Sequence, residues 1–244
     1  MASYEPQSTK VKKGVIITAL NMANVCYQPD VYTSKAPVTE AIPGQTFYFL
    51  DEIKAFDQMI VNEGSWNQTW TCAALMAFKE DLSIDEMETR RHLLYLSKTE
   101  GITAVTVNGH SSEVHACSAD EQKHLLDISG DEIGDKIPLI NGIYADGSMQ
   151  AASLAKMAHN GGATALLCFP PHSMRMGGIS HRPEMAFAHF KTIADATDLP
   201  LIIFQYADEL AYSLDTLVDL VEEIPSVCAV KDWSPAQRHE QNIK

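Results

Sequence analysis

Helical patterns alternate with short, continuous apolar runs after Asp81, and this alternation constrains the fold more than any other feature of the chain. The apolar runs begin near residues 102, 137, 164, 199 and 227, at intervals of roughly 27 to 35 residues. They are rich in Val, Ile and Leu and do not alternate with polar residues, so they indicate strands that are buried on both faces. Strands of this kind with helices between them form parallel βα units.

Capping motifs and turn residues separate these runs. The capping boxes Ser83-Ile84-Asp85-Glu86 and Ser118-Ala119-Asp120-Glu121 predict helices over roughly 83–99 and from 118 to about 128. Further helices are expected near 148–159, 183–196 and 214–223, and strands at 14–20, 102–107, 137–141, 164–169, 199–205 and 227–231. Six core strands fit either an open doubly wound sheet or a (β/α)8 barrel. The nucleotide-binding motifs of doubly wound sheets are absent: neither GxGxxG after the first strand nor GxxxxGKS/T occurs. The periodicity alone favours the barrel only slightly.

A long connection follows the first strand. More than fifty residues separate it from Phe78, and their one clear amphipathic pattern is a helix at 51–61. Connections of this length are uncommon in a compact domain and are either functional lids or foreign to the fold. The chain also ends thirteen residues after Lys231, so either two strands lie unrecognised in the long segment or the chain is shortened. We therefore expect one domain over 1–244, a TIM-type (β/α)8 barrel that is incomplete at its C-terminus, with 21–72 as an atypical insertion.

The charge balance and the cysteines restrict the partners and the compartment. Eighteen Lys and Arg residues stand against 32 Asp and Glu, a formal net charge of −14. A field of this sign repels phosphate backbones and anionic lipid, so we expect neither a nucleic-acid nor a membrane partner. The five cysteines are scattered and form no CxxC pair, which argues against a disulfide scaffold or structural zinc. No apolar run approaches the ~18 residues of a membrane span. A cytoplasmic protein is therefore expected.

Lys231 is the most informative single residue, because it ends the apolar run 227–230. Sites in α/β folds are built at the carboxyl ends of parallel strands. A lysine there either extends its ammonium group to solvent or, if burial keeps the amine neutral, attacks a carbonyl carbon to form a Schiff base. With an ordinary pKa of ~10.4, only about 0.04% of the amine is neutral at pH 7, so the second role requires a lowered pKa.

Polar and aromatic residues follow the ends of three other predicted strands. The loop that contains His110 and Ser111 can surround an anion such as a carboxylate, although an ordinary polar loop fits equally well. Phe204 and Tyr206 share one face by the period of two, and the Tyr206 hydroxyl either shuttles protons or only packs. His172 ends another strand and would line the same opening.

The nine histidines do not indicate a metal site. Neither HxxxH nor HExxH occurs, and His110, Glu113 and His115 lie too close together on one loop. We therefore expect neither a metal nor another cofactor.

Several of these segments, taken in order, resemble the dihydrodipicolinate synthase/N-acetylneuraminate lyase family of class I aldolases. Gly14-Val15-Ile16 is similar to the opening strand of the family. Four further segments are similar to family motifs: residues 77–85 to TPFxxDGSID, 109–113 to GTTGE, 189–200 to HFKAIAEATDLP, and 224–232 to IPNVVGIKD. The last of these carries the family's Schiff-base lysine. The resemblance covers 76–234 and the first strand, and the order of several separate motifs makes it more specific than any one of them.

The resemblance implies a (β/α)8 barrel, usually a homo-oligomer (a tetramer or a dimer), in which Lys231 binds pyruvate or a related 2-oxo acid as an imine. His110 and Ser111 stand where two threonines hold the carboxylate of the keto acid. Phe204 stands where the catalytic tyrosine is expected and cannot transfer a proton, so Tyr206 is the candidate surrogate. His172 lies where a tyrosine often lies. The segment 207–209 replaces the proline and the arginine-bearing loop of dihydrodipicolinate synthases, which argues against the lysine-pathway reaction.

The leading hypothesis is therefore a metal-independent lyase or aldolase. It would cleave a C–C bond, form one by condensation, or dehydrate its substrate. Lys231 would be the nucleophile and Tyr206 the acid/base, with His110 and Ser111 as carboxylate contacts. Phe204 and His172 would line the substrate site. The main alternative is a catalytically silent or truncated family member that acts as a binding or regulatory subunit. A third option is a metal-dependent aldolase, which would lose activity with a chelator.

Overall fold

The structure, a computed structural model, describes residues 16–18, 70–172, 182–206 and 210–233. These residues form one seven-stranded sheet in the order β1-β7-β6-β5-β4-β3-β2, and every neighbouring pair is parallel. The strands are β1 (Ile16–Thr18), β2 (Trp70–Ala73), β3 (Ile102–Val107), β4 (Leu139–Ile143), β5 (Ala165–Cys168), β6 (Leu201–Gln205) and β7 (Val227–Asp232). The helices are α3 (Glu86–Lys98), α4 (Ala119–Ile133), α5 (Ser148–Asn160), α6 (Pro183–Ala194) and α7 (Leu214–Glu223), with the short 3-10 turns η2 (His110–Ser112) and η3 (Val114–Ala116).

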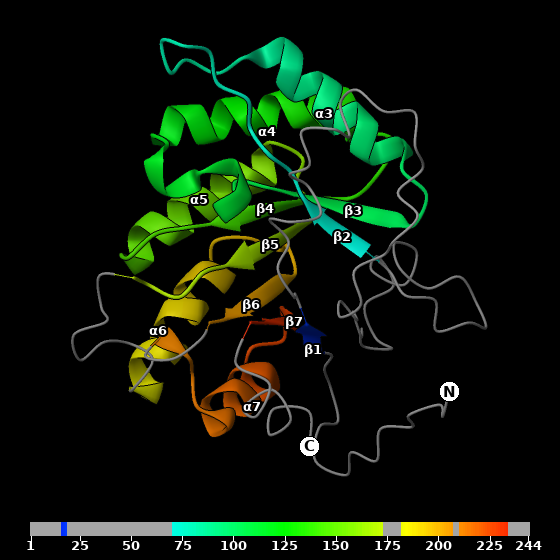
Figure 1. Cartoon of the computed structure of the whole chain (residues 1–244). Coiled ribbons are helices and arrows are strands. Elements are labelled where there is room, and N and C mark those ends of the chain that lie inside the picture. The colour runs from blue at the N-terminus through cyan, green and yellow to red at the C-terminus, as the bar shows by residue number, and fades with distance from the viewer. Residues whose placement is uncertain (1–15, 19–69, 173–181, 207–209, 234–244) are drawn as a thin grey trace.

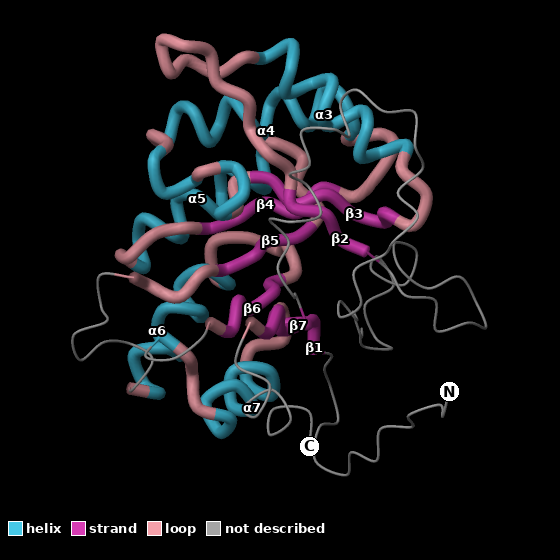
Figure 2. Tube along the Cα trace, in the orientation of Figure 1, coloured by secondary structure: helices cyan, strands magenta, loops and turns pink. Residues whose placement is uncertain are grey.

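The strand order identifies the type of α/β fold. From β2 to β7 each strand lies beside the next one in the chain, and a helix connects each pair. A doubly wound sheet would reverse its order at a switch point, whereas a barrel winds in one direction. The sheet curls, and the helices lie along one side of it (Figures 1 and 2). The prediction of a parallel (β/α)8-type barrel rather than a doubly wound sheet is confirmed.

The prediction of six core strands is wrong, because it omits β2. This strand pairs with β3 and reads Trp70-Thr71-Cys72-Ala73, which is not a Val- and Ile-rich run. It begins inside the predicted insertion 21–72, so the last residues of that segment belong to the sheet. The strand beside β3 at one edge of the sheet is therefore β2, whereas β1 pairs with β7 at the opposite edge. Residues 19–69, including the helix expected at 51–61, lie outside the described residues.

The two predicted capping boxes have different outcomes. Ser118 and Glu121 form theirs: the Ser118 N–H donates to Glu121 Oε2 (2.8 Å) and the Glu121 N–H donates to Ser118 Oγ (3.3 Å). The helix that they begin extends to Ile133, beyond the predicted end near 128. The prediction of a capping box at Ser83 is wrong, because the N-cap of α3 is Asp85. The N–H and hydroxyl of Ser83 instead both donate to Asp81 Oδ1 (3.0 and 2.6 Å).

Apolar side chains form two clusters on the two faces of the sheet. The larger cluster joins strand residues to the helices, for example Leu93 of α3 and Phe190 of α6. The smaller, inner cluster contains no helix residue. Its buried members are Ala104, Ile140, Ala165, Leu167, Phe169, Ile202, Phe204, Cys228 and Ala229, and Tyr144 and Tyr206 pack against it. Side chains that fill the concave face of a curled parallel sheet are typical of a barrel interior.

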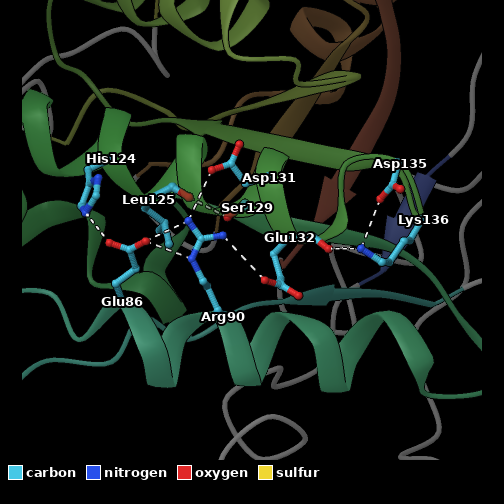
Figure 3. A network of polar contacts seen from close by, with 9 residues as sticks. All are labelled: Glu86, Arg90, His124, Leu125, Ser129, Asp131, Glu132, Asp135 and Lys136. Carbon is cyan, nitrogen blue, oxygen red and sulfur yellow. Dashed lines mark hydrogen bonds and ion pairs between the residues drawn. The ribbon is translucent and has the colours of Figure 1, made fainter.

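A network of charged side chains joins the outer surfaces of α3 and α4 (Figure 3). Arg90 contacts Glu86 on its own helix (2.8 Å) and both Asp131 (3.3 Å) and Glu132 (3.6 Å) on α4. Exposed ion pairs of this kind each contribute at most about 1 kcal/mol, so the network orients the two helices more than it stabilises them. None of the described helices has the length and apolar character that a membrane crossing requires.

Candidate active site

Aromatic rings gather at the carboxyl ends of five consecutive strands. We call this set the ring cluster: His110 after β3, Tyr144 after β4, Phe169 and His172 after β5, Phe204 and Tyr206 at the end of β6, and Trp233 after β7. The ring centroids of its neighbouring members lie between 4.7 and 6.1 Å apart. The cluster forms because parallel strands place the residues that follow them at one edge of the sheet.

Lys231 lies against the floor of the ring cluster. The β6–β7 register pairs Phe204 with Lys231, so both side chains leave the same face of the sheet. The Lys231 Nζ lies 4.1 Å from the centroid of the Phe204 ring. Part of the residue remains exposed, but burial of the amine lowers the pKa of Lys231 to about 8. Roughly a tenth of the amine is then neutral at pH 7, compared with about one part in three thousand at the ordinary pKa.

The loop after β3 holds His110 through hydrogen bonds on both sides. Asn108, which has a positive φ of 52°, donates from Nδ2 to Asn141 Oδ1 (2.8 Å) and to the Gln122 carbonyl (2.9 Å). Ser112 donates its hydroxyl to the Ala74 carbonyl beyond β2 (2.7 Å). The 3-10 turn η2 thereby stays fixed across the ends of β2, β3 and β4.

His110 is a neutral imidazole at physiological pH. Burial lowers its pKa to about 4, and the positive charges of His172 and Lys231 add to this effect. A neutral ring can accept one hydrogen bond and donate another, which a protonated ring cannot do. His110 can therefore accept a hydrogen bond at one ring nitrogen and donate a hydrogen bond from the other to a substrate oxygen.

Tyr206 is hydrogen-bonded to His110. The Tyr206 hydroxyl lies 3.1 Å from His110 Nδ1 and 3.3 Å from Nε2. Burial raises the pKa of Tyr206 to about 12, so the phenol is protonated. His110, whose pKa is lowered to about 4, is a much weaker base than the phenolate, so the proton stays on Tyr206. The two side chains therefore form a neutral pair, and Tyr206 releases its proton only to a more basic group.

Gln205 is hydrogen-bonded to the backbone of two residues near Tyr206, namely Tyr212 and Trp233. It is fully buried and points to the helix side, opposite to Phe204 and Tyr206. Its Nε2 donates to the Tyr212 carbonyl (2.9 Å), its Oε1 accepts from the Tyr212 N–H (3.0 Å), and its carbonyl accepts from the Trp233 N–H (2.9 Å). One residue thus links the ends of β6 and β7.

The structure brings most of the predicted site residues together. Lys231, His110, Phe204, Tyr206 and His172 all contact the ring cluster or belong to it. Ser111 lies next to His110 in η2, half-buried, and its hydroxyl has no hydrogen bond to another described residue.

Sequence reasoning missed Tyr144, Phe169 and Trp233. Each follows a strand by one residue, which was the signal that could have identified them. Among the residues described by the structure, no group of three or more His, Cys, Asp or Glu side chains could hold a metal ion.

Comparisons with known proteins agree with this geometry. Residues 68–244 match the model of the dihydrodipicolinate synthetase family. A 4-hydroxy-tetrahydrodipicolinate synthase from Dechloromonas aromatica is 30% identical over 162 residues, which cover 66% of this chain and 53% of the relative. The solved synthase of Methylacidiphilum fumariolicum SolV matches with a TM-score of 0.64 and 22% identity, over 72% of this chain and 57% of that one. The chloride-inhibited synthase of Acinetobacter baumannii, solved with pyruvate, matches with a TM-score of 0.60 and 26% identity, over 68% and 55%.

The extent of these matches defines what they show. The chain spans about half the length of the curated relatives that it matches. The family model, in contrast, covers well over half of this chain, from β2 through the lysine-bearing strand β7. The resemblance that the sequence motifs indicate is confirmed: the chain belongs to the dihydrodipicolinate synthetase family.

Proposed function

We propose that the chain forms a Schiff-base site for pyruvate or a related 2-oxo acid and serves a lyase or aldolase reaction. The observation that supports this most strongly is the Lys231 amine, which lies 4.1 Å from the Phe204 ring and has a pKa lowered to about 8. A desolvated lysine amine at the carboxyl end of a barrel strand is suited to attack a carbonyl group. The related synthase of Acinetobacter baumannii was solved with pyruvate, which supports the same substrate class here.

The residues divide the chemistry among them. The neutral Lys231 amine attacks the carbonyl carbon of the 2-oxo acid, and loss of water gives an imine. The hydroxyl of the first adduct leaves as water with a proton from Tyr206, and the phenolate then accepts the proton lost from the adjacent carbon. The resulting enamine can form or break a C–C bond or take part in a dehydration. Tyr206 supplies the acid/base group, because its hydroxyl is protonated and held by His110.

The carboxylate of the substrate would be bound by the loop after β3. The N–H groups of His110 and Ser111 begin η2, and the first N–H groups of a helical turn have no partner inside it. The Ser111 hydroxyl and a ring nitrogen of His110 add side-chain donors. His172 would line the same space, because its ring lies 5.8 Å from that of His110 and 5.1 Å from that of Tyr206.

Borohydride trapping tests the proposal directly. The protein is incubated with pyruvate and sodium borohydride, and its peptides are analysed by mass spectrometry. We expect the mass of a reduced pyruvate on Lys231 and not on Lys136 or Lys191, both of which are exposed. The variant Lys231→Met should not be modified, and a cooperative unfolding transition should show that it is still folded. An unmodified Lys231, under conditions that trap a control class I aldolase, would refute the proposal.

A catalytically silent subunit is the second candidate. Phe204, at the position where a catalytic tyrosine is expected, is buried under the lysine amine and carries no hydroxyl. A silent subunit would trap pyruvate at Lys231 but would neither consume nor release a 2-oxo acid with any aldehyde. Turnover measured with the same preparation decides between the two candidates.

The assembly and the compartment complete the proposal. We infer a homo-oligomer, a dimer or tetramer, from the family resemblance. We infer the cytoplasm from the scattered cysteines of the sequence, which form no CxxC pair. Light scattering measured on the purified chain tests the first of these points.

A further inference from the structure

We propose that the ring cluster binds an aryl group, so that the enamine on Lys231 reacts with aryl aldehydes in preference to small polar aldehydes. The inference rests on the proposed function, since it names the second carbonyl substrate of the same site. Its basis is the composition of the cluster, to which all five strands from β3 to β7 contribute a ring.

The ring cluster has a buried floor and a partly exposed rim. Phe169 and Phe204 form the floor, with 1% and 3% of their surface exposed and their ring centroids 5.1 Å apart. Tyr144, His172 and Tyr206 stand above them and remain partly exposed. Several of these pairs meet nearly edge to face, for example His172 and Tyr206 at 86° and Tyr144 and Phe169 at 72°. Aromatic rings favour such edge-to-face contacts, and the partly exposed rim rings offer the same kind of contact to a further ring.

Trp233 supplies the most exposed part of this rim. It lies two residues after Lys231, on the same face by the period of two, and 45% of its surface is exposed. Its indole meets the Tyr206 ring at 78° and 5.0 Å between centroids, and the Phe204 ring at 32° and 6.1 Å. The residue that follows the lysine strand thus presents a large apolar surface next to the ring that covers the amine.

The charges around the ring cluster favour an uncharged partner. Lys231 is the cation that contacts its floor, and the proposed imine uses this nitrogen. Asp146, exposed beyond β4, places a negative charge near Tyr144 and His172, as its effects on their pKa values show. His110 is neutral. The described rim therefore presents no further cation to the second substrate and offers it mainly aromatic rings.

The chemical step balances without any further reactant. The enamine carbon of the bound 2-oxo acid attacks the carbonyl carbon of the aldehyde, and the aldehyde oxygen takes up one proton, which Tyr206 can donate. Water then hydrolyses the imine, which releases a 4-hydroxy-2-oxo acid and restores the amine of Lys231. The tyrosine regains its proton from solvent, and no electrons leave or enter the system.

The test compares two aldehydes on the full chain. Pyruvate is condensed with benzaldehyde or with glyceraldehyde, and the products are measured by mass spectrometry. We expect a kcat/KM for benzaldehyde at least tenfold above that for glyceraldehyde. Trp233→Ala should lower the benzaldehyde value about tenfold and change the glyceraldehyde value less than about twofold, whereas Trp233→Phe should retain most of the preference. Tyr95→Ala, which removes an exposed ring on α3, is the matched control and should change neither value.

The outcomes separate this inference from the proposed function. Pyruvate trapping at Lys231 is measured in every variant and also reports that the barrel is folded. Trapping with equal use of both aldehydes, or an equal loss for both in Trp233→Ala, would overturn the aryl preference alone. Absence of trapping in the unmodified protein would overturn the proposed function and this inference together.

Discussion

Lys231 and Phe204 face each other across the β6–β7 ladder, with the lysine amine 4.1 Å from the centre of the ring. Two effects of the ring act in opposite directions on the pKa of the amine. Its π face attracts the cation and so raises the pKa, whereas its bulk excludes water and lowers it. Burial lowers the pKa of Lys231 to about 8, and substitutions of Phe204 can show how much the attraction of the ring opposes this.

Imine formation at Lys231 should follow this pKa. The amine is protonated and inert below the pKa and neutral above it, so the trapping rate with pyruvate should rise with pH and reach half its maximum near pH 8. The measurement is the initial rate of borohydride-trapped label between pH 6 and about 10.5. A midpoint near the ordinary value of lysine would contradict the desolvation of the amine.

Two substitutions of Phe204 separate the opposing effects of the ring. Phe204→Ala admits water to the amine, so the midpoint of the trapping rate should move up by about one pH unit. Phe204→Leu keeps the site dry but removes the π face, so the midpoint should stay or fall. An unchanged midpoint in Phe204→Ala would show that burial by Phe204 is not the cause of the lowered pKa. The comparison requires only the pH midpoint, so a loss of stability does not obscure it.

Removal of the Tyr206 hydroxyl should separate imine formation from turnover. Tyr206→Phe retains the ring contacts with His172 and Trp233 but loses the hydrogen bond to His110. We expect turnover with pyruvate and an aldehyde to fall by about 10²- to 10⁴-fold, which is the usual contribution of a positioned acid/base group. Trapping of pyruvate should change little. Unchanged turnover would remove Tyr206 from the acid/base role.

The fold should lose stability in mild acid because of His92. This histidine is buried, its Nε2 accepts a hydrogen bond from the Leu75 N–H (3.1 Å), and burial lowers its pKa from 6.5 to about 4. Between these two values His92 binds more protons in the unfolded chain than in the native protein, so its contribution to stability falls as the pH drops through this window and is constant above it. The loss by pH 4 is on the order of 3 kcal/mol.

Urea unfolding at pH 7 and at pH 5 measures this effect. His92→Gln retains an acceptor for the Leu75 N–H and cannot be protonated, so its stability should change less between the two pH values. His124→Gln, at an exposed position of α4, should behave like the unmodified protein. Equal pH dependence of all three proteins would exclude His92 as a cause.

Gly142 should not tolerate a side chain. An added Cβ would lie 1.9 Å from the Asn108 carbonyl oxygen and 3.2 Å from the Phe169 ring, so β3 and β4 would have to separate. We expect Gly142→Ala to lower the free energy of unfolding by about 3 kcal/mol or more, as strong overpacking does. At Gly147, the N-cap of α5, the nearest atom to an added Cβ is 3.9 Å away. Gly147→Ala should therefore lower it by less than about 1 kcal/mol. Thermal unfolding of the two variants checks the difference.

The sequence by itself determined the elements from β3 to β7 and the parallel class of the sheet. Long apolar runs and capping residues act locally, so 102–107 is a strand and Ser118 begins a helix in the structure as predicted. The motifs around Lys231 likewise identified the family without coordinates. The strand β2 was not predictable in this way, because its four residues form no apolar run rich in Val, Ile and Leu, and its place in the sheet is seen only in its pairing with β3.

Tertiary structure alone decided which side chains meet. Nothing local places Trp233 against Tyr206, or the Tyr206 hydroxyl 3.1 Å from a nitrogen of His110, almost a hundred residues earlier in the chain. These contacts exist because the parallel ladders bring the carboxyl ends of separate strands to one edge. The lowered pKa of Lys231 has the same origin: desolvation depends on the groups that surround the amine, and strands distant in the sequence supply them.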